Sequence, residues 1–408
     1  MEYLSVRSVQ MIGRILINVE YMQKKGLLTI LPVMFGFFIM AFVDLVGLAS
    51  NYVKNDFGFS DTVSNLISIA CYVWFLVFSV PTGIMMNRYG RKTVVLMSFL
   101  LTAAAMLLPV FFSQSFIVIL VAFALIGIGN TLLQVSLNPL VQDVVAADRL
   151  TGTLTLGQFI KSAASLIAPV LFPALAASFL GWKTAFLIYA VICLIGTLWL
   201  GLTPIQKNQP VPDVSFAATF RLLKDRTILF FFLGMLALVG ADVGIGFTFP
   251  KILQEKFALS LDASAPYLTV YFLAKAAGAF VGGLVLMKLK EDKFYLISII
   301  VAVVGLAGMA FADSLVLELV AVAVFGLGYA NMFSIIFSLA LKHAPSRSNE
   351  VSSLLIMGVA GGAVVTPVLG IVTDMFHTQN AAVIAVIVVW LFVMSLYGLV
   401  RKTSASVN

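Results

Sequence analysis

Apolar runs recur along the whole of this chain, and many are close to the roughly 20 residues that an α-helix needs to cross a bilayer. Of the 408 residues, 61% are apolar and only 11% are charged, and the mean hydropathy is +1.08. Soluble globular domains do not have this composition. The sequence therefore predicts an all-α membrane protein with twelve transmembrane helices, at 30–53, 64–86, 93–112, 115–138, 153–178, 183–203, 228–250, 266–287, 294–312, 315–341, 351–375 and 379–400.

The one long polar interruption falls at the centre of the chain and is interpreted as a linker. No other stretch is long enough to form a soluble domain, so any activity must be built from the helices and their short loops. The expected organisation has five parts: an N-terminal cytoplasmic extension at 1–29, a six-helix bundle at 30–203, a cytoplasmic linker at 204–227, a second six-helix bundle at 228–400 and a tail at 401–408.

The basic residues that flank the predicted helices are unevenly divided between the two sides of the membrane. Most lie in the loops that share a side with the N-terminus, whereas the opposite side carries only Lys54, Lys183, Lys251 and Lys256. This bias predicts that both termini face the cytoplasm of a bacterial-type plasma membrane. The net charge of +7 is then explained by anionic lipid headgroups, with no nucleic acid partner.

Three segments of the first half reappear in the second half at a nearly constant separation of about 198 residues. "AFVDLVGLAS" matches "VGADVGIGFT" and places Asp44 over Asp242; "LIGIGN" matches "VFGLGY"; and "SLIAPVL" matches "AVVTPVL", which places Pro169 over Pro367. The chain is therefore interpreted as a duplicated six-helix unit. Two such bundles can rock about a cavity near the bilayer midplane and expose it to one side at a time.

The loop "GIMMNRYGRK" resembles the signature of the major facilitator superfamily. The resemblance implies a conformational latch at the cytoplasmic ends of the bundles, formed by Gly83, Asn87, Arg88, Gly90 and Arg91. Asn87 stands where the family usually has aspartate, and a neutral amide holds an arginine less strongly than a carboxylate does.

Two further stretches, "LNPLVQDVV" and the region 336–374 with "GGAVVTPVLG", resemble the fucose/galactose/glucose:cation symporter branch of that superfamily. In this branch a carboxylate in the first helix and a glutamate in the fourth are similar in position to Asp44 and Gln134. The glutamate is replaced here by an amide. A coupling scheme that needs both acids is therefore not carried over whole.

Four ionisable side chains stand out inside the predicted spans: Asp44, Lys161, Asp242 and Lys275. An ionised group at the bilayer centre costs roughly 2.5 kcal/mol or more, so each is expected to face a cavity or a partner. The sequence places one acid and one base in each half. Asp44 and Lys161 are predicted as ion-coupling residues, and Asp242 and Lys275 as residues of the substrate site.

Neutral polar side chains accompany these charges at helical spacing. Amides donate and accept hydrogen bonds to sugar hydroxyls, and aromatic faces commonly complete such sites. The predicted substrate-binding residues are accordingly Asn51, Trp74, Asn130, Gln134, Asn138, Gln158, Tyr271 and Asn331, together with the two C-terminal charges.

Each feature also has a structural interpretation. Asp44 with Lys161, and Asp242 with Lys275, could be ion pairs that hold helices together. The asparagines could be hydrogen-bonding links between helices. The aromatic residues could fill the core. These alternatives stay open at the level of sequence.

The leading hypothesis is cation-coupled symport of a monosaccharide, such as a hexose or deoxyhexose, by alternating access. Asp44 would bind a proton or sodium on one side and release it on the other, with Lys161 as an internal counter-ion. No cofactor is expected beyond that coupling ion, no metal site is predicted, and the resemblance implies that one chain works as a monomer among membrane lipids.

Two other interpretations remain. A transporter of an anionic solute, such as a sugar acid, would use Lys161 and Lys275 as binding charges. A membrane enzyme or sensor would need a metal-ligand cluster, a nucleophile beside a histidine or a soluble signalling domain, and the sequence contains none of these patterns.

Overall fold

The computed structural model describes residues 28–407 except 59–60, 113–114, 168–174, 176–177, 206–215 and 260. Most of the expected N-terminal extension, residues 206–215 of the linker and Pro169 lie outside these residues. Within the described part of the chain, nine helices are long and apolar enough to cross a membrane, and residues Leu28–Asp44 form a shorter apolar helix. The two remaining predicted spans, at 153–178 and 351–375, fall on shorter helical pieces. The nine long helices, the helix Leu28–Asp44 and these two regions together are consistent with twelve crossings.

The N-terminal bundle begins with a helix over residues 28–40 that continues through a 3₁₀ turn. The bundle then contains the 3₁₀ turn η1 (Ala41–Leu45), α2 (Val46–Phe57), α3 (Asp61–Tyr89), α4 (Arg91–Phe111), α5 (Phe116–Gln142), η2 (Ala147–Arg149), α6 (Leu150–Ser165) and α8 (Lys183–Leu202). Ser115 caps α5, because its hydroxyl accepts a hydrogen bond from the backbone N–H of Val118 at 3.5 Å.

The C-terminal bundle repeats this order. It contains α10 (Arg226–Phe257), α11 (Leu261–Ser264), η4 (Ala265–Tyr267), α12 (Leu268–Val285), α13 (Glu291–Phe311), α14 (Leu315–Tyr329), α15 (Met332–His343), η5 (Pro345–Arg347), α16 (Ser348–Met357), η6 (Gly358–Ala360), α17 (Gly361–Phe376), α18 (Asn380–Ser395) and α19 (Tyr397–Val407). Between the bundles lie α9 (Phe216–Arg221) and η3 (Leu222–Lys224).

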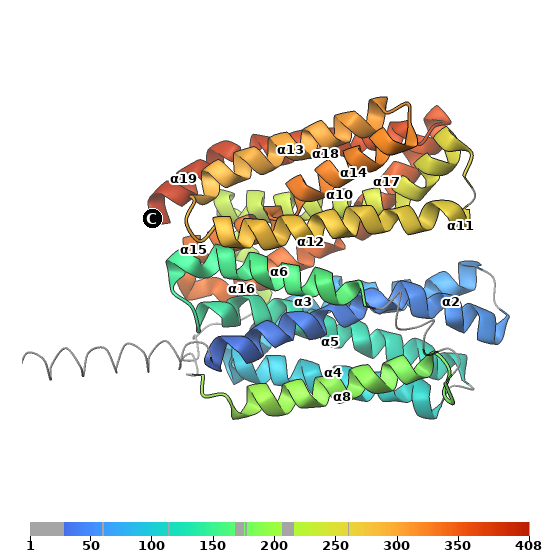
Figure 1. Ribbon diagram of the computed structural model, residues 1–408. Coiled ribbons are helices and arrows are strands. Elements are labelled where there is room, and N and C mark those ends of the chain that lie inside the picture. Colours follow the sequence, from blue (N-terminus) through green and yellow to red (C-terminus); the bar gives the residue numbers. More distant parts are fainter. Residues whose placement is uncertain are drawn as a thin grey trace, which may run out of the picture.

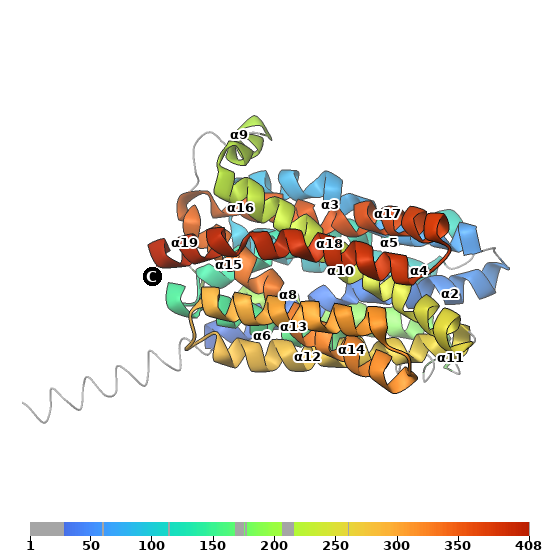
Figure 2. The ribbon, with the colours of Figure 1, turned by 90° about the horizontal axis from the view of Figure 1, so that it is seen from above.

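Figure 1 shows the two bundles as two stacked groups of nearly parallel helices, the N-terminal one in blue to green and the C-terminal one in yellow to red. One end of the molecule carries the C-terminus, the end of α3 and the start of α10. We call it the linker end, since α9 also lies there, beside the helices (Figure 2). The opposite end carries α2 and α11.

The two bundles pack against each other through α6 on α12 and through α3 and α5 on α16. Glycines make the first of these contacts close: a Cβ added at Gly152 would lie 2.8 Å from the backbone oxygen of Gly283. Small residues at a helix crossing let the backbones approach, which is the usual basis of helix association in membranes. The contact at Gly152 lies near the start of α6, at the linker end.

Candidate functional site

Asp44 lies where the first helix of the N-terminal bundle changes from α to 3₁₀ geometry, in η1. Its Oδ2 accepts a hydrogen bond of 2.5 Å from the hydroxyl of Ser165, and its Oδ1 lies 4.0 Å from Nζ of Lys161. The ammonium is therefore at the outer limit of an ion pair. The side chain of Asp44 remains 37% exposed and that of Lys161 23% exposed. The carboxylate is accessible although it lies in the middle of a predicted span.

A row of amides on α5 lies next to this turn. The side-chain amide of Asn130 donates to the backbone oxygen of Met40 at 2.8 Å. Gln134 donates to the side-chain oxygen of Asn130 at 2.8 Å, and Asn138 donates to the backbone oxygen of Gln134 at 2.8 Å. All three amides are buried. The Met40 carbonyl belongs to the residue that precedes η1, so the amide row supports the break that presents Asp44.

Two other predicted residues of the N-terminal bundle, Trp74 and Gln158, are half-buried, and a third, Asn51, has a side chain that is not described. Trp74 is half-buried and its indole nitrogen has no hydrogen-bond partner among the described residues, while its ring meets Phe78 edge to face at 5.5 Å. Gln158 is half-buried on α6, the helix that also carries Lys161. The side chain of Asn51 lies outside the described part of the structure.

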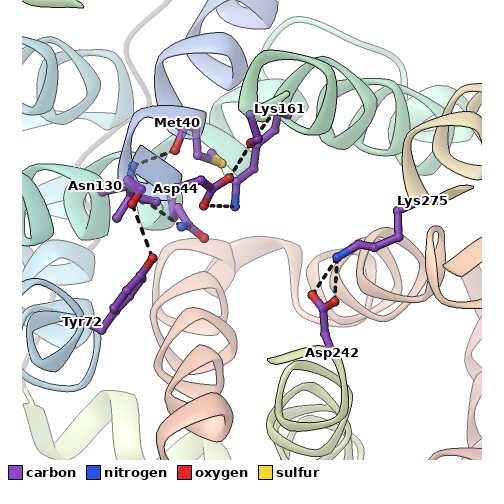
Figure 3. A network of polar contacts seen from close by, with 10 residues as sticks. Met40, Asp44, Tyr72, Asn130, Lys161, Asp242 and Lys275 are labelled. Atoms are coloured by element: carbon purple, nitrogen blue, oxygen red, sulfur yellow. Dashed lines mark hydrogen bonds and ion pairs between the residues drawn. The ribbon is translucent and has the colours of Figure 1, made fainter. Parts of the chain in front are cut away.

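The charged pair of the C-terminal bundle is tight. Nζ of Lys275 donates to both carboxylate oxygens of Asp242, at 2.7 and 2.8 Å, and the hydroxyl of Tyr271 donates to Oδ1 at 2.5 Å. The ammonium also lies over the rings of Tyr329, Tyr271 and Phe272, at 4.6, 5.1 and 5.8 Å from their centroids. Cation–π contacts of this kind stabilise a desolvated ammonium. Figure 3 shows both acid–base pairs, each within its own bundle.

The side chains of this C-terminal pair are 20% (Asp242) and 15% (Lys275) exposed. Tyr271 is fully buried, so its ring has no free face for a ligand. Asn331 lies between α14 and α15, where its amide donates to the backbone oxygen of Gly278 at 3.1 Å. Its side-chain oxygen is buried and has no hydrogen-bond partner in the described part of the chain.

The predicted latch residues gather at the linker end. The Arg91 guanidinium binds Asp143 of its own bundle at 2.6 Å, and across the bundle interface it donates to Asn349 and Ser348, each at 2.7 Å. Asn349 in turn donates to the side-chain oxygen of Asn87 at 2.5 Å. Arg91 therefore joins the two bundles through α16.

The other three predicted latch residues make no side-chain hydrogen bond to this network: Gly83 and Gly90 contribute through the backbone, and Arg88 lies apart from it. Gly83 lies so close to α16 that an added Cβ would be 3.3 Å from the backbone oxygen of Asn349 and would collide with Ser353. Gly90 has a φ of 88°, which favours glycine, and it forms the turn between α3 and α4. Arg88 is exposed and lies over the ring of Tyr89, so it does not join the network.

A second buried ion pair at the linker end was not expected from the sequence. Glu291 is the first residue of α13, as Arg91 is the first residue of α4. Nζ of Lys342 binds its Oε1 at 2.5 Å, and the hydroxyl of Thr151 from the N-terminal bundle lies 3.0 Å from the same oxygen. The repeat could have located this pair, because Glu291 and Lys342 correspond to Arg91 and Asp143 with the charges exchanged.

The arrangement therefore consists of two duplicated bundles, an accessible carboxylate in a helix break and a hydrogen-bonded closure at one end. The sequence model of the Major Facilitator Superfamily matches residues 30–367 and, in an overlapping match, 242–407. The chain belongs to the major facilitator superfamily. Members of this superfamily are multi-pass membrane transporters, so the chain is a transporter and not an enzyme.

Relatives within the major facilitator superfamily cover most of the chain. The glucose/galactose transporter of Brucella abortus biovar 1 (strain 9-941) is 25% identical over 390 residues, which is 90% of this chain and 92% of that protein. The L-fucose-proton symporter of Escherichia coli (strain K12) is 24% identical over 345 residues, or 76% of this chain and 78% of that protein. A crystal structure of the E. coli fucose:proton symporter FucP has the same fold, with a TM-score of 0.80 at 21% identity, covering 91% of this chain and 97% of that one.

Proposed function

We propose that this chain is a secondary active symporter that couples the entry of a monosaccharide to a proton or sodium gradient. The observation that carries the proposal is the state of Asp44: a carboxylate in a helix break, 37% exposed, which among the described residues has one short hydrogen bond and an ammonium at 4.0 Å. An accessible carboxylate whose ammonium partner is this distant has room to bind a cation and release it again. An ionisable group within a membrane span is a functional site by default.

The neutral amides beside Asp44 support a polyhydroxylated substrate. Asn130 and Gln134 are linked to each other and to the backbone, so their positions are fixed before a ligand arrives. Preorganised amides lose little entropy when they bind hydroxyl groups. Relatives named for glucose, galactose and fucose favour a hexose or deoxyhexose as the substrate class.

The charge bias of the loops supports an orientation in which the linker end faces the cytoplasm of a bacterial-type plasma membrane. The hydrogen bonds of Arg91 to Asn349 and Ser348 then close the cytoplasmic end. A state closed at this end is the one in which Asp44 would exchange its cation with the outside. Alternating access requires that these bonds break in the opposite state.

The test is uptake into proteoliposomes with proton and sodium gradients imposed separately, using a panel of labelled hexoses and deoxyhexoses. One gradient is expected to drive accumulation of at least one sugar above its external concentration. Equilibration without accumulation under both gradients would contradict symport.

Asp44→Asn removes the ionisable group while it keeps the size of the side chain. Because the asparagine cannot carry a proton or balance a cation, we expect concentrative uptake to fall to background. Exchange of labelled for unlabelled sugar should persist at a reduced rate, since the amide row and the bundle interface are unchanged. Undiminished accumulation by Asp44→Asn would refute the coupling role, with exchange serving as the control for folding.

A second candidate function is transport of an anionic solute such as a sugar acid. It is favoured by Lys161, whose ammonium is held by no short contact to Asp44 and is 23% exposed. Lys275 does not support it in the same way, because both of its bonds to Asp242 are short. Inhibition of uptake by uronates and not by neutral hexoses would identify this second function.

A further inference from the structure

Two tyrosines occupy corresponding positions in the bundles, Tyr72 on α3 and Tyr271 on α12. Each hydroxyl contacts a residue 29 positions earlier in the chain, on the first helix of its bundle. For Tyr271 that residue is Asp242. For Tyr72 it is Val43, the neighbour of Asp44. The duplicated fold therefore directs both hydroxyls to corresponding positions on the first helix of each bundle. In the C-terminal bundle the acid, Asp242, occupies that position, whereas in the N-terminal bundle the acid, Asp44, is displaced to the next residue after it.

In the C-terminal bundle this contact is complete. Tyr271 donates to Asp242 at 2.5 Å, its ring is fully buried, and Lys275 donates to both carboxylate oxygens. Hydrogen bonds to a charged acceptor are shorter and stronger than neutral ones. The arrangement shows how this fold can balance the charge of an aspartate with partners from its own bundle.

In the N-terminal bundle the corresponding contact is weak. The hydroxyl of Tyr72 lies 3.4 Å from the backbone oxygen of Val43, at the limit of a hydrogen bond. That oxygen already accepts the backbone N–H of Val46. Tyr72 is 43% exposed, and Figure 3 shows its hydroxyl directed at the segment that carries Asp44. The tyrosine can therefore change acceptor without leaving a buried group unsatisfied.

The backbone explains the displacement. Asp242 lies inside the continuous helix α10, whereas Asp44 lies in the 3₁₀ turn η1. A 3₁₀ helix has three residues per turn and rises about 2.0 Å per residue, against 3.6 residues and 1.5 Å in an α-helix. Conversion of η1 to α geometry would rotate and shift Asp44 relative to Val43, toward the position that Asp242 occupies in its own bundle.

We propose that Tyr72 is a positioning residue for Asp44. When the carboxylate is ionised and has released its cation, the hydroxyl of Tyr72 leaves the carbonyl of Val43 and donates to Asp44, as Tyr271 donates to Asp242. The phenol keeps its proton throughout. The inference rests on the proposed role of Asp44 in coupling.

The other groups that face Asp44 leave this role open. From α6 the carboxylate meets Ser165 and Lys161. From α5 the amide of Asn130 donates to the backbone oxygen of Met40, beside η1. On α3 the thiol of Cys71 is fully buried and free. Among the described side chains of α3, Tyr72 is a neutral donor whose hydroxyl already contacts Val43, the neighbour of Asp44.

Tyr72→Phe tests the inference in the same proteoliposomes. Because the variant removes a donor that competes with the coupling cation for the carboxylate, we expect tighter cation binding. A hydrogen bond to a charged group corresponds to about a tenfold change in affinity. The half-saturating concentration of the coupling cation should fall about tenfold, which for protons moves the uptake profile about one pH unit upward.

Tyr189→Phe is the matched control, since Tyr189 is a buried tyrosine of the same bundle whose ring packs on Phe42. Its cation dependence should equal that of the wild type. Sugar exchange at saturating cation reports that each variant is folded. In an Asp44→Asn background, Tyr72→Phe should produce no further change in exchange.

The outcomes separate this inference from the proposed function. If Asp44→Asn abolishes accumulation but Tyr72→Phe has the wild-type cation dependence, Tyr72 has no positioning role and the coupling role of Asp44 stands. If Asp44→Asn accumulates sugar normally, the proposed function itself fails. Looser cation binding in Tyr72→Phe would also overturn the inference, because it would make the hydroxyl a cation ligand.

Discussion

Asp44 and Asp242 are related by the repeat, and their different surroundings suit them to different tasks. Asp242 accepts short hydrogen bonds from Lys275 and Tyr271, so its charge is balanced within the bundle. Among the described residues, Asp44 has one short bond, from Ser165, and its side chain is 37% exposed. Removing a fully paired charge from its partners is costly in a low-dielectric interior. We therefore expect Asp44 to exchange partners and Asp242 to keep them.

This contrast predicts a specific pattern of stability for the C-terminal pair. Asp242→Asn alone leaves the ammonium of Lys275 largely buried without its counter-ion. Lys275→Met alone leaves the carboxylate of Asp242 largely buried without its counter-ion. Loss of one partner of a buried pair destabilises a protein by about 3–5 kcal/mol. Each single variant should therefore lower the thermal unfolding midpoint and the folded yield in detergent. The double variant Asp242→Asn/Lys275→Met should recover most of the loss, and a double variant no better than the singles would contradict a balanced pair.

Residue chemistry explains which parts of the site were predictable. Four ionisable residues in apolar spans are exceptional, so Asp44, Lys161, Asp242 and Lys275 stand out in the sequence. Because each half of the sequence contains one of these acids and one of these bases, the acid and the base of the same half are expected to pair. Ser165 does not stand out, because serine is common in transmembrane helices. The buried ring of Tyr271 could not be foreseen either, since its hydroxyl is directed by a partner on another helix.

Helix breaks are the main difference between the predicted and observed elements. The sequence predicts continuous spans at 30–53, 315–341 and 351–375, and the structure interrupts them at η1, at Ala330–Asn331 and at η6. Backbone groups freed inside a membrane need partners from other helices. Asn130 supplies such a partner for the carbonyl of Met40. A hydropathy profile locates the membrane spans, but it does not predict contacts between helices that are distant in the sequence, and these contacts are what make the breaks possible.

At the linker end, the ion pair between α13 and α15 predicts an effect of charge reversal. Glu291 and Lys342 have side chains that are only 7% and 4% exposed. Glu291→Lys places two ammonium groups in contact, so we expect loss of folded protein or of transport. The exchanged variant Glu291→Lys/Lys342→Glu restores opposite charges and should regain at least half of the wild-type transport rate. A failure of the exchanged variant to exceed Glu291→Lys would show that the contact of Thr151 with Glu291 matters more than the pair.

The first turn of α10 predicts a pH-dependent stability. Oδ1 of Asp225 accepts the backbone N–H of Thr227 at 2.7 Å, and Oδ2 lies 3.0 Å from His343. Partial burial acts to raise the pKa of Asp225, but the hydrogen bonds from His343, Ile228 and Thr227 outweigh it and lower the pKa below the usual 3.8. The stability that these bonds supply is present above pH 3.8 and is lost as the pH falls through the lowered pKa.

Asp225→Ala should therefore destabilise the protein near neutral pH, since loss of a helix N-cap costs about 1 kcal/mol. The difference in unfolding midpoint from the wild type should shrink as the pH falls below 3.8. Thermal unfolding in detergent from pH 5 downward is the measurement. A difference that grows as the pH falls below 3.8 would contradict the assigned direction.

At the scale of the whole molecule, the repeat predicts two bundles, and the structure has two bundles of corresponding helices. The sequence does not predict which end is closed, because the same side chains must serve every state of an alternating-access cycle. Closure depends on the relative rotation of the bundles, which brings Arg91 to Asn349 across the interface. That rotation is set by small differences in free energy between states, and local sequence patterns do not record them.

The close approach at Gly83 allows this balance to be shifted. A leucine at position 83 would collide with Ser353 and approach the backbone of Asn349, so Gly83→Leu should force α3 away from α16 and break the contacts of Arg91. We expect the population to move toward a state open at the linker end. Spin-label distances between α3 and α16 should lengthen there, and a cysteine placed in the interface should become reactive from that side. Gly201→Leu is the control, because no atom of the described residues lies within 4 Å of an added Cβ at Gly201. Unchanged distances in a folded Gly83→Leu variant would mean that the linker end does not open by separation of these two helices.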